Sequence, residues 1–303
     1  MPSDIPPSAT PEVAAPGVIH DIGYRHFEGQ RRGRGYILRS LFVDSLRGAY
    51  GLGRSGRSKV MPLLLLAVMC LPALVIVAIT AVVRVDELVA GYSSYLLNLQ
   101  LVIMIFVAAQ APVLVSRDLR FRVTSLYFSR PLERMHYVLG KYGAMACALL
   151  VLTTAPLTIM FLGALVVGLP VGEQIPDYLR AMAGAAVLSL VLAGIGVVIA
   201  AVTPRRGLGV AAVGTVLVVL SGVQAIAQGI ASEQGAHEAA AYLGLLSPFT
   251  MVAGIQGSLL GASSPLPLPP GATGAAAFAL AALLLVGGCF AALLLRYRSV
   301  SVS

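Results

Sequence analysis

Six long apolar runs, none of which contains a charged residue, constrain this chain more than any other feature. They cover residues 60–83, 96–116, 142–168, 181–203, 207–231 and 273–295. A helix rises by roughly 1.5 Å per residue, so each run is long enough to cross a hydrocarbon core of about 30 Å. Lipid cannot hydrogen-bond an open backbone, so such runs cross it as helices. The sequence therefore predicts an all-α membrane protein with six transmembrane helices.

The positive charges are distributed unevenly around these runs. Of the 303 residues 11% are charged, against about 25% in a typical soluble domain. With six crossings, all but two of the 21 Lys and Arg residues fall on one side, the exceptions being Arg84 and Arg180. Short loops rich in Lys and Arg stay in the cytoplasm. We therefore predict that both termini are cytoplasmic, and we read the net charge of +8 as topology and not as a nucleic-acid site.

Two segments precede the first run on its cytoplasmic side. Residues 1–34 are rich in proline and basic side chains, which predicts a disordered N-terminus. The predicted transmembrane domain covers residues 35–303, and the second segment is its first part. Residues 36–50 show helical periodicity, with Leu38 and Leu41 on the apolar face. We expect an amphipathic helix in the inner membrane interface. The alternative is a helix whose apolar face packs on a partner.

Residues 232–272 form the longest outer segment. It contains no Lys or Arg, and its apolar part is interrupted by Gly244, Pro248 and Gly254. A seventh crossing through it would place the basic C-terminal tail outside, against the charge rule. We expect short outer or re-entrant helices before the last run, with an ordinary surface loop as the alternative.

The chain lacks the motifs of the common catalytic and nucleotide-binding sites. It has no GxxxxGK[ST] sequence, because Gly140 and Lys141 are followed by Tyr142 and lack the upstream glycine. It also has no HExxH zinc motif and no GxSxG nucleophile elbow. Its three cysteines lie within the apolar runs and fit no zinc pattern. We therefore expect no catalysis, metal or cofactor in this chain itself.

The apolar runs contain neutral polar residues but no ionisable ones. Proton-driven carriers keep carboxylates, histidines or arginines within the membrane, so this absence disfavours a proton-coupled carrier. A neutral pathway suits a lipophilic or amphipathic substrate. The residues that we predict to line it are Asn98, Gln100, Gln110, Thr154 and Gln224. The alternative is that such side chains only join helix to helix by hydrogen bonds.

The segment between the second and third runs carries most of the functional signal. It reads RDLRFRVTSLYFSRPLERMHYVLGK over residues 117–141, with six basic and two acidic residues. Its apolar side chains, such as Leu126 and Tyr127, are not needed in a purely solvated loop. Pro131 divides it, because the residue before a proline avoids helical angles. We expect two short helices that dock on a cytoplasmic partner. The alternative is a charged loop that only anchors the topology.

This segment resembles the coupling loop of the type-2 ABC exporter permease family. Members share the pattern E-x-x-x-G-T-L-x-x-L-x-x-x-P-x-x-R…GK. The matching positions in this chain are Asp118, Leu126, Tyr127, Pro131, Arg134, Gly140 and Lys141. Asp118 stands where glutamate is common, and Val123-Thr124 replaces the Gly-Thr step. The six runs, the amphipathic helix and the sequence LLSPFT at residues 245–250 are similar to the same family.

The resemblance implies a membrane subunit that works with separate ATPases. Two permease chains, identical or different, would form the substrate pathway in a bacterial plasma membrane. ABC ATPase subunits, which bind ATP and Mg²⁺, would attach beneath them and drive export. The residues of the ATPase-coupling loop would be Asp118, Arg120, Arg122, Leu126, Tyr127, Arg130, Pro131 and Arg134.

Two other classes of function fit the same apolar bundle. A secondary carrier or channel would transport without an ATPase, although its spans lack ionisable residues. A non-transporting membrane scaffold, or an enzyme of lipid metabolism, would move no substrate. The sequence has no acid–base pair or metal cluster that supports the enzyme.

Overall fold

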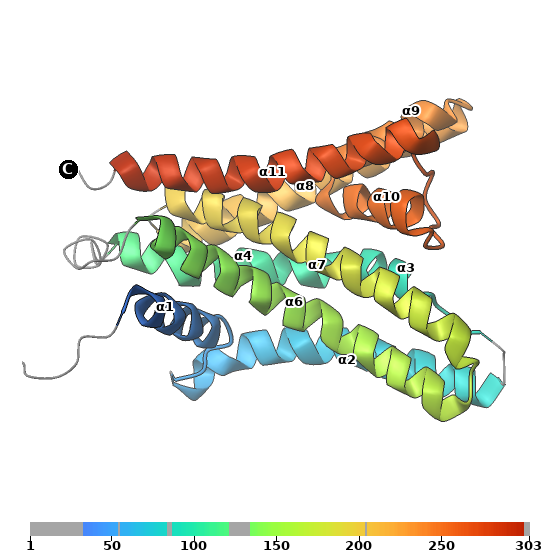
Figure 1. Cartoon of the computed structure of the whole chain (residues 1–303), viewed down its shortest axis with the longest axis horizontal. Helices are drawn as coiled ribbons and strands as arrows, with labels where there is room; N and C mark the ends of the chain where they lie inside the picture. The colour runs from blue at the N-terminus through green and yellow to red at the C-terminus, as the bar shows by residue number, and fades with distance from the viewer. Residues whose placement is uncertain (1–32, 54, 84–86, 121–133, 204, 300–303) are drawn as a thin grey trace, which may run out of the picture. The chain divides into compact units, whose positions relative to one another are not determined.

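The computed structural model describes residues 33–53, 55–83, 87–120, 134–203 and 205–299, and helices dominate these ranges (Figure 1). The helices are α1 (Arg34–Ala49), α2 (Gly56–Val83), α3 (Tyr92–Asn98), α4 (Gln100–Arg120), α6 (Arg134–Val167), α7 (Val171–Val202), α8 (Arg206–Glu233), α9 (His237–Leu243), the 3₁₀ turn η1 (Gly244–Leu246), α10 (Pro248–Leu260) and α11 (Gly271–Ser299). No strand occurs within these ranges, so the predicted all-α class is confirmed for them. Of the N-terminus predicted to be disordered (1–34), residues 1–32 lie outside the described residues, and Arg34 is already the first residue of α1.

Five helices are long and apolar enough to cross a membrane: α2, α6, α7, α8 and α11. This is the composition of a multi-pass membrane protein. The run predicted at residues 96–116 begins in α3 and continues in α4. These two helices meet the length and apolarity requirement only as a pair, and the pair is bent by 59° at Leu99. The described residues therefore contain five candidate spans, or six if the bent pair counts as one.

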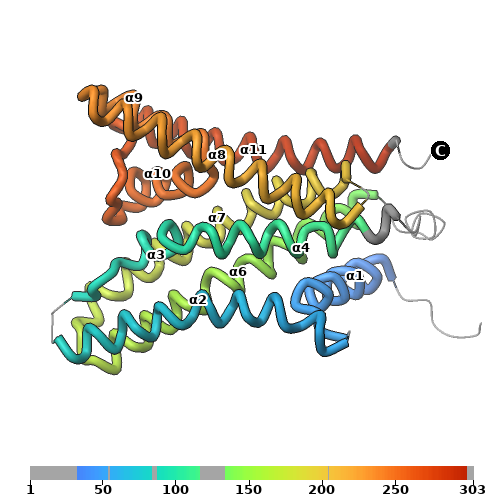
Figure 2. The backbone as a smooth tube through the Cα atoms, turned by 180° about the vertical axis from the view of Figure 1, so that it is seen from behind, coloured from blue at the N-terminus to red at the C-terminus, as the bar shows by residue number. Residues whose placement is uncertain are grey.

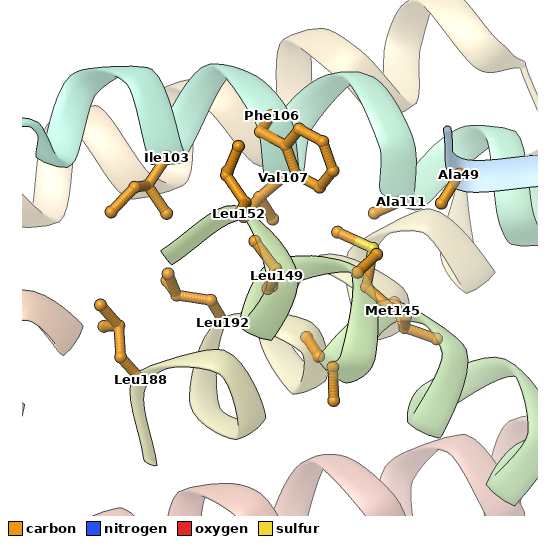
Figure 3. Packing of buried hydrophobic residues seen from close by; sticks show 14 of the residues in the cluster. Ala49, Ile103, Phe106, Val107, Ala111, Met145, Leu149, Leu152, Leu188 and Leu192 are labelled. Carbon is orange, nitrogen blue, oxygen red and sulfur yellow. The ribbon is translucent and has the colours of Figure 1, made fainter. Parts of the chain in front are cut away.

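α7 is the most deeply buried of these helices. It packs against α6, α4, α11, α10 and α8. Small side chains on α7, such as Ala181, Gly184 and Gly196, allow neighbouring helices to approach, as membrane helices commonly do. Figure 3 shows the large side chains of the core between three helices, with Ile103, Phe106 and Val107 from α4, Met145, Leu149 and Leu152 from α6, and Leu188 and Leu192 from α7.

α2 and α11 turn large apolar side chains outward. The exposed ones include Leu64, Leu71 and Leu74 on α2, and Leu283 and Leu284 on α11. A soluble protein rarely leaves apolar patches of this extent uncovered. Lipid is the solvent for which such helix faces are suited.

α1 uses its apolar face within the protein. Leu41 is buried against Gly140 of α6, and Phe42 lies over Gly143, one turn further along the same helix. The side chains of Arg39 and Arg47 are exposed on the opposite face. The predicted helix and its apolar face are thus present. This face packs on α6 and α4. Its position in a membrane interface stays a prediction.

The turn after α1 ties this helix to the core. The Tyr50 hydroxyl donates a hydrogen bond of 2.7 Å to the Ala148 carbonyl of α6. Its ring lies 5.8 Å from that of Phe106 in α4. Burial raises the pKa of Tyr50, so its hydroxyl keeps the proton that it donates.

Several helix ends with basic side chains lie together, and we call this the basic end. The Ser116 hydroxyl of α4 donates to the carbonyls of Ala200 (3.2 Å) and Thr203 (3.0 Å). Arg296 Nε of α11 donates to the Ala201 carbonyl at 3.4 Å. The basic residues here are Arg134, Arg205, Arg206, Arg296 and Arg298. Figures 1 and 2 show α1 at this end and α9 and α10 at the other.

The boundaries of the predicted coupling segment need a correction. We expected a loop with two short helices over residues 117–141, but α4 continues to Arg120 and α6 already begins at Arg134. Lys141 therefore lies inside a candidate span and not in the loop. Its side chain is buried, and its Nζ lies 5.7 Å from the centre of the Tyr137 ring. A cation over an aromatic face is a favourable contact in a buried site.

The segment before the last helix forms short helices. α9, η1 and α10 occupy residues 237–260, and α10 packs its buried face on α7 and α11. A Cβ on Gly254 would lie 2.5 Å from Cε1 of Phe278, so this glycine lets α10 approach α11 closely. The non-helical stretch 261–270 that follows is called the strap below. It begins at Gly261 (φ 66°) and is followed by Gly271 (φ 61°), and both glycines have left-handed backbone angles.

Candidate functional site

An open groove of about 430 Å³ lies at the end of the protein opposite the basic end. The bend between α3 and α4, one face of α8, the start of α10 and the strap form its walls. Its polar lining consists of Asn98, Gln100, Gln224, Gln228, Ser232 and Thr250. Its apolar lining consists of Leu97, Ala225, Gly229, Pro265, Leu266 and Pro267. The volume falls within the range of small-molecule sites.

The bend at Leu99 brings Asn98 and Gln100 into the groove together. Residues two positions apart point in different directions on a continuous helix. Here the Leu99 N–H completes α3 by donating to the Tyr95 carbonyl, while the N–H groups of the next helix return to the Leu99 carbonyl. α4 thus starts in a new direction at this residue, and the side chains on both sides of the break line one cavity.

Two tyrosines hold α3 in this bent position. The Tyr92 hydroxyl donates to Gln174 Oε1 of α7 at 2.8 Å. The Tyr95 hydroxyl donates to the Met69 carbonyl of α2. Both side chains are buried, so α3 is attached to two different spans and not to α4 alone.

Gln224 and Gln228 form a pair on the inner face of α8. They are four residues apart and therefore on the same face, and only 4% and 7% of their surfaces are exposed. Gln224 Nε2 donates to Gln228 Oε1 at 2.5 Å, and Gln228 Nε2 donates to the Ala240 carbonyl of α9 at 2.9 Å. A carbonyl can only accept, so Ala240 sets the orientation of both amides. Within the described residues this leaves Gln224 Oε1 without a hydrogen bond.

The start of α10 and the strap, which form two walls of the groove, are also held in place. The Thr250 hydroxyl donates to the Gly244 carbonyl at 2.7 Å, which fixes the first turn of α10 to η1. The strap packs Leu268 against Gly257 of α10, where a Cβ would lie 2.2 Å from Leu268 Cδ2. Pro265, Leu266 and Pro267 are thereby placed along the groove.

The groove is neutral. None of its lining residues is ionisable, and the described part of the chain contains no cluster of His, Cys, Asp or Glu that could hold a metal ion. A second open groove of about 420 Å³ shares Pro267 with it and is lined by His237, Glu238, Leu268 and Pro270. The arrangement of neutral amides and hydroxyls supports binding by hydrogen bonds, and it offers no nucleophile and base at bonding distance for catalysis.

The structure brings three of the five predicted pathway residues together, namely Asn98, Gln100 and Gln224. Gln110 is buried further along α4, and the Thr154 hydroxyl donates to the Leu150 carbonyl of its own helix at 2.7 Å. These two lie away from the groove. Gln228, Ser232 and Thr250 were not predicted. The spacing of four residues between Gln224 and Gln228 is the signal that could have identified the first of them.

Little of the predicted coupling loop can be placed. Asp118 and Arg120 lie in the last turn of α4, and Arg134 is the first residue of α6. The predictions for Arg122, Leu126, Tyr127, Arg130 and Pro131 fall outside the described residues. The two helices that flank the segment, α4 and α6, both pack in the core.

No protein-family model matches this chain, and neither does any curated protein. The likeness to a transporter family thus depends on the residues of the 117–141 segment and on the fold expected with them.

Proposed function

We propose that this chain is the membrane-spanning permease subunit of an ATP-driven ABC exporter in a bacterial plasma membrane. The observation that carries the proposal is a neutral polar groove at one end of an apolar helix bundle, connected by a single helix, α4, to the basic segment at the other end. Two such chains, or this chain and a different permease, form the substrate pathway. Separate ATPase subunits bind ATP and Mg²⁺.

The topology in this proposal has six spans. The bent pair of α3 and α4 counts as one span, which places both chain ends on the same side of the membrane. The positive charges of the basic end support a cytoplasmic location for that side. α1 then lies along the inner surface, and the groove belongs to the outer half of the membrane.

α4 is the element that couples the two ends. Its 21 residues span about 31 Å at roughly 1.5 Å per residue, with Gln100 at the groove and Arg120 at the coupling loop. α4 packs against α6, α7 and α8. A force on the coupling loop therefore reaches the bend at Leu99 through one continuous helix. We assign ATPase contact to the loop residues Asp118, Arg120, Arg122, Leu126, Tyr127, Arg130, Pro131 and Arg134.

The test is affinity purification of the tagged full-length chain in mild detergent, with mass spectrometry of the proteins that co-purify. We expect a stoichiometric P-loop ATPase. The double variant R122E/R130E should lose it, because the ATPase surface that receives these charges would then be repelled. The matched control is R180E, which reverses a half-buried arginine that is paired with Asp177 at 2.7 Å at the opposite end, and it should retain the ATPase. A folded, active preparation without any ATPase would contradict the proposal.

The alternative function is a secondary carrier. One observation favours it, namely the buried side chain of Lys141. Ionisable residues within membrane helices often mark ion pathways. Lys141 lies beside the Tyr137 ring near the basic end and not at the groove, so we rank this function second. Gradient-driven transport by the purified chain alone in proteoliposomes would support it. A non-transporting scaffold would show neither transport nor ATPase binding.

A further inference from the structure

We propose that the groove binds the uncharged, hydroxyl-bearing headgroup of a membrane amphiphile. The inference rests on the proposed function, because it names the class of substrate that the permease takes from the membrane. Three features of the groove carry it: its neutrality, the orientation of its amides and its depth in the bundle.

The neutral lining selects against charged headgroups. A charge taken from water into a site of low polarity is costly unless an opposite charge compensates it. The groove has no lining residue of either sign, so phosphate, carboxylate and ammonium groups all lack an oppositely charged partner there. Hydroxyl and amide groups suffer no such penalty where they find hydrogen-bond partners.

The amide pair presents both an acceptor and donors to a ligand. Gln228 Nε2 donates to the Ala240 carbonyl and Gln224 Nε2 donates to Gln228 Oε1, which leaves Gln224 Oε1 as an acceptor and the second N–H of each NH₂ group as a donor. Asn98 and Gln100 each add a carbonyl oxygen and an NH₂ group on the facing wall. A sugar-like hydroxyl both donates and accepts, so a group with several hydroxyls can satisfy both walls. Leu97, Ala225 and Leu266 offer apolar contact to the rest of the molecule.

The depth of the groove matches the level of lipid headgroups. Gln224 follows Arg206, the first residue of α8, by 18 residues, which is about 27 Å along the helix. A hydrocarbon core is about 30 Å thick, so the groove lies near the membrane boundary opposite the basic end. On its other side α8 exposes Val223, Ile226 and Ile230, as a lipid-facing helix does. A headgroup can therefore enter from this leaflet while its chains stay in lipid.

The experiment uses the full-length chain in phosphatidylcholine nanodiscs. Monoglucosyl diacylglycerol and phosphatidylglycerol with the same acyl chains are added in equal amounts, and native mass spectrometry counts the lipids that stay bound. We expect a several-fold enrichment of the glucosyl lipid. Equal or preferred retention of phosphatidylglycerol would overturn the proposal. Methyl glucoside that binds as tightly as the glucosyl lipid would overturn the assignment to a lipid headgroup and indicate a soluble ligand.

Two variants test the assigned residues. Q224M removes the amide pair, and N98L changes an exposed residue of the opposite wall that is not needed for packing; both should abolish most of the enrichment. The matched control is Q256M, which alters another buried glutamine, bonded to the Arg180 carbonyl and outside the groove. It should keep the wild-type preference. Full enrichment in both Q224M and N98L would contradict the site.

The same preparations separate this inference from the proposed function. An ATPase that co-purifies with a chain showing no lipid preference would sustain the permease and refute the headgroup class. A clear preference without any ATPase would sustain the groove's chemistry and refute the ATP-driven exporter.

Discussion

A single glycine, Gly196, lets α7 lie close to α4. A Cβ built on it would be 2.7 Å from Cγ1 of Val107 and 3.1 Å from Cβ of Ala111. Membrane helices associate largely by close packing, since lipid offers little hydrophobic driving force between them. At the residue scale, the core therefore depends on where side chains are absent as much as on the large side chains in Figure 3.

We predict that G196L destabilises the protein by about 1–3 kcal/mol, because the added side chain has no space between α7 and α4. The thermal denaturation midpoint of the detergent-solubilised chain should fall. G287L is the matched control: Gly287 in α11 has open space around its Cβ position, so its midpoint should stay near that of the wild type. Equal midpoints for the two variants would show that this contact does not limit stability.

At the scale of elements, α1 shows how an amphipathic pattern acquires a specific partner. Its apolar face fits over Gly140 and Gly143 of α6, where missing side chains leave a shallow surface for Leu41 and Phe42. The pattern of α1 alone is equally suited to a lipid interface. The glycines of α6, about 100 residues later in the chain, are what turn this face toward the protein.

We predict that L41A loosens α1 from the bundle. Removing a buried leucine costs about 2–5 kcal/mol, and the loss should be local because α1 lies at one end of the protein. Hydrogen exchange should show faster exchange of the α1 amides, with α7 unchanged. L52A, at an exposed leucine just after α1, should exchange like the wild type. Unchanged protection of α1 in L41A would mean that Leu41 does not anchor it.

On the scale of the whole molecule, the arrangement separates two chemical environments. Basic residues lie at the end of the protein where α6 and α8 begin and α11 ends, and neutral amides lie where α4 starts. α4 and α8 both run between the two ends (Figure 2), and α4 contributes Ile103, Phe106 and Val107 to the buried core.

We predict that the two ends face opposite sides of the membrane. After Cys70, Cys147 and Cys289 are replaced by alanine, single cysteines are introduced by S55C near the basic end and S263C in the strap, both at exposed positions. A membrane-impermeant maleimide should label S263C in intact cells and S55C only after permeabilisation. The charge asymmetry is the reason. Labelling of both cysteines from outside would contradict the six-span topology.

Apolar runs, helix class and the pairing of Gln224 with Gln228 are local properties, so length, hydropathy and a spacing of four residues suffice to predict them. The bend at Leu99 depends on distant segments, because two tyrosine hydroxyls that bond to other helices hold it. No pattern within residues 96–116 predicts it. The same holds for the groove, whose walls come from residues about 130 positions apart in the chain. Hydropathy indicates only how well each helix by itself is suited to lipid. Which helices meet, and which polar side chains then share one cavity, depends on packing between distant segments.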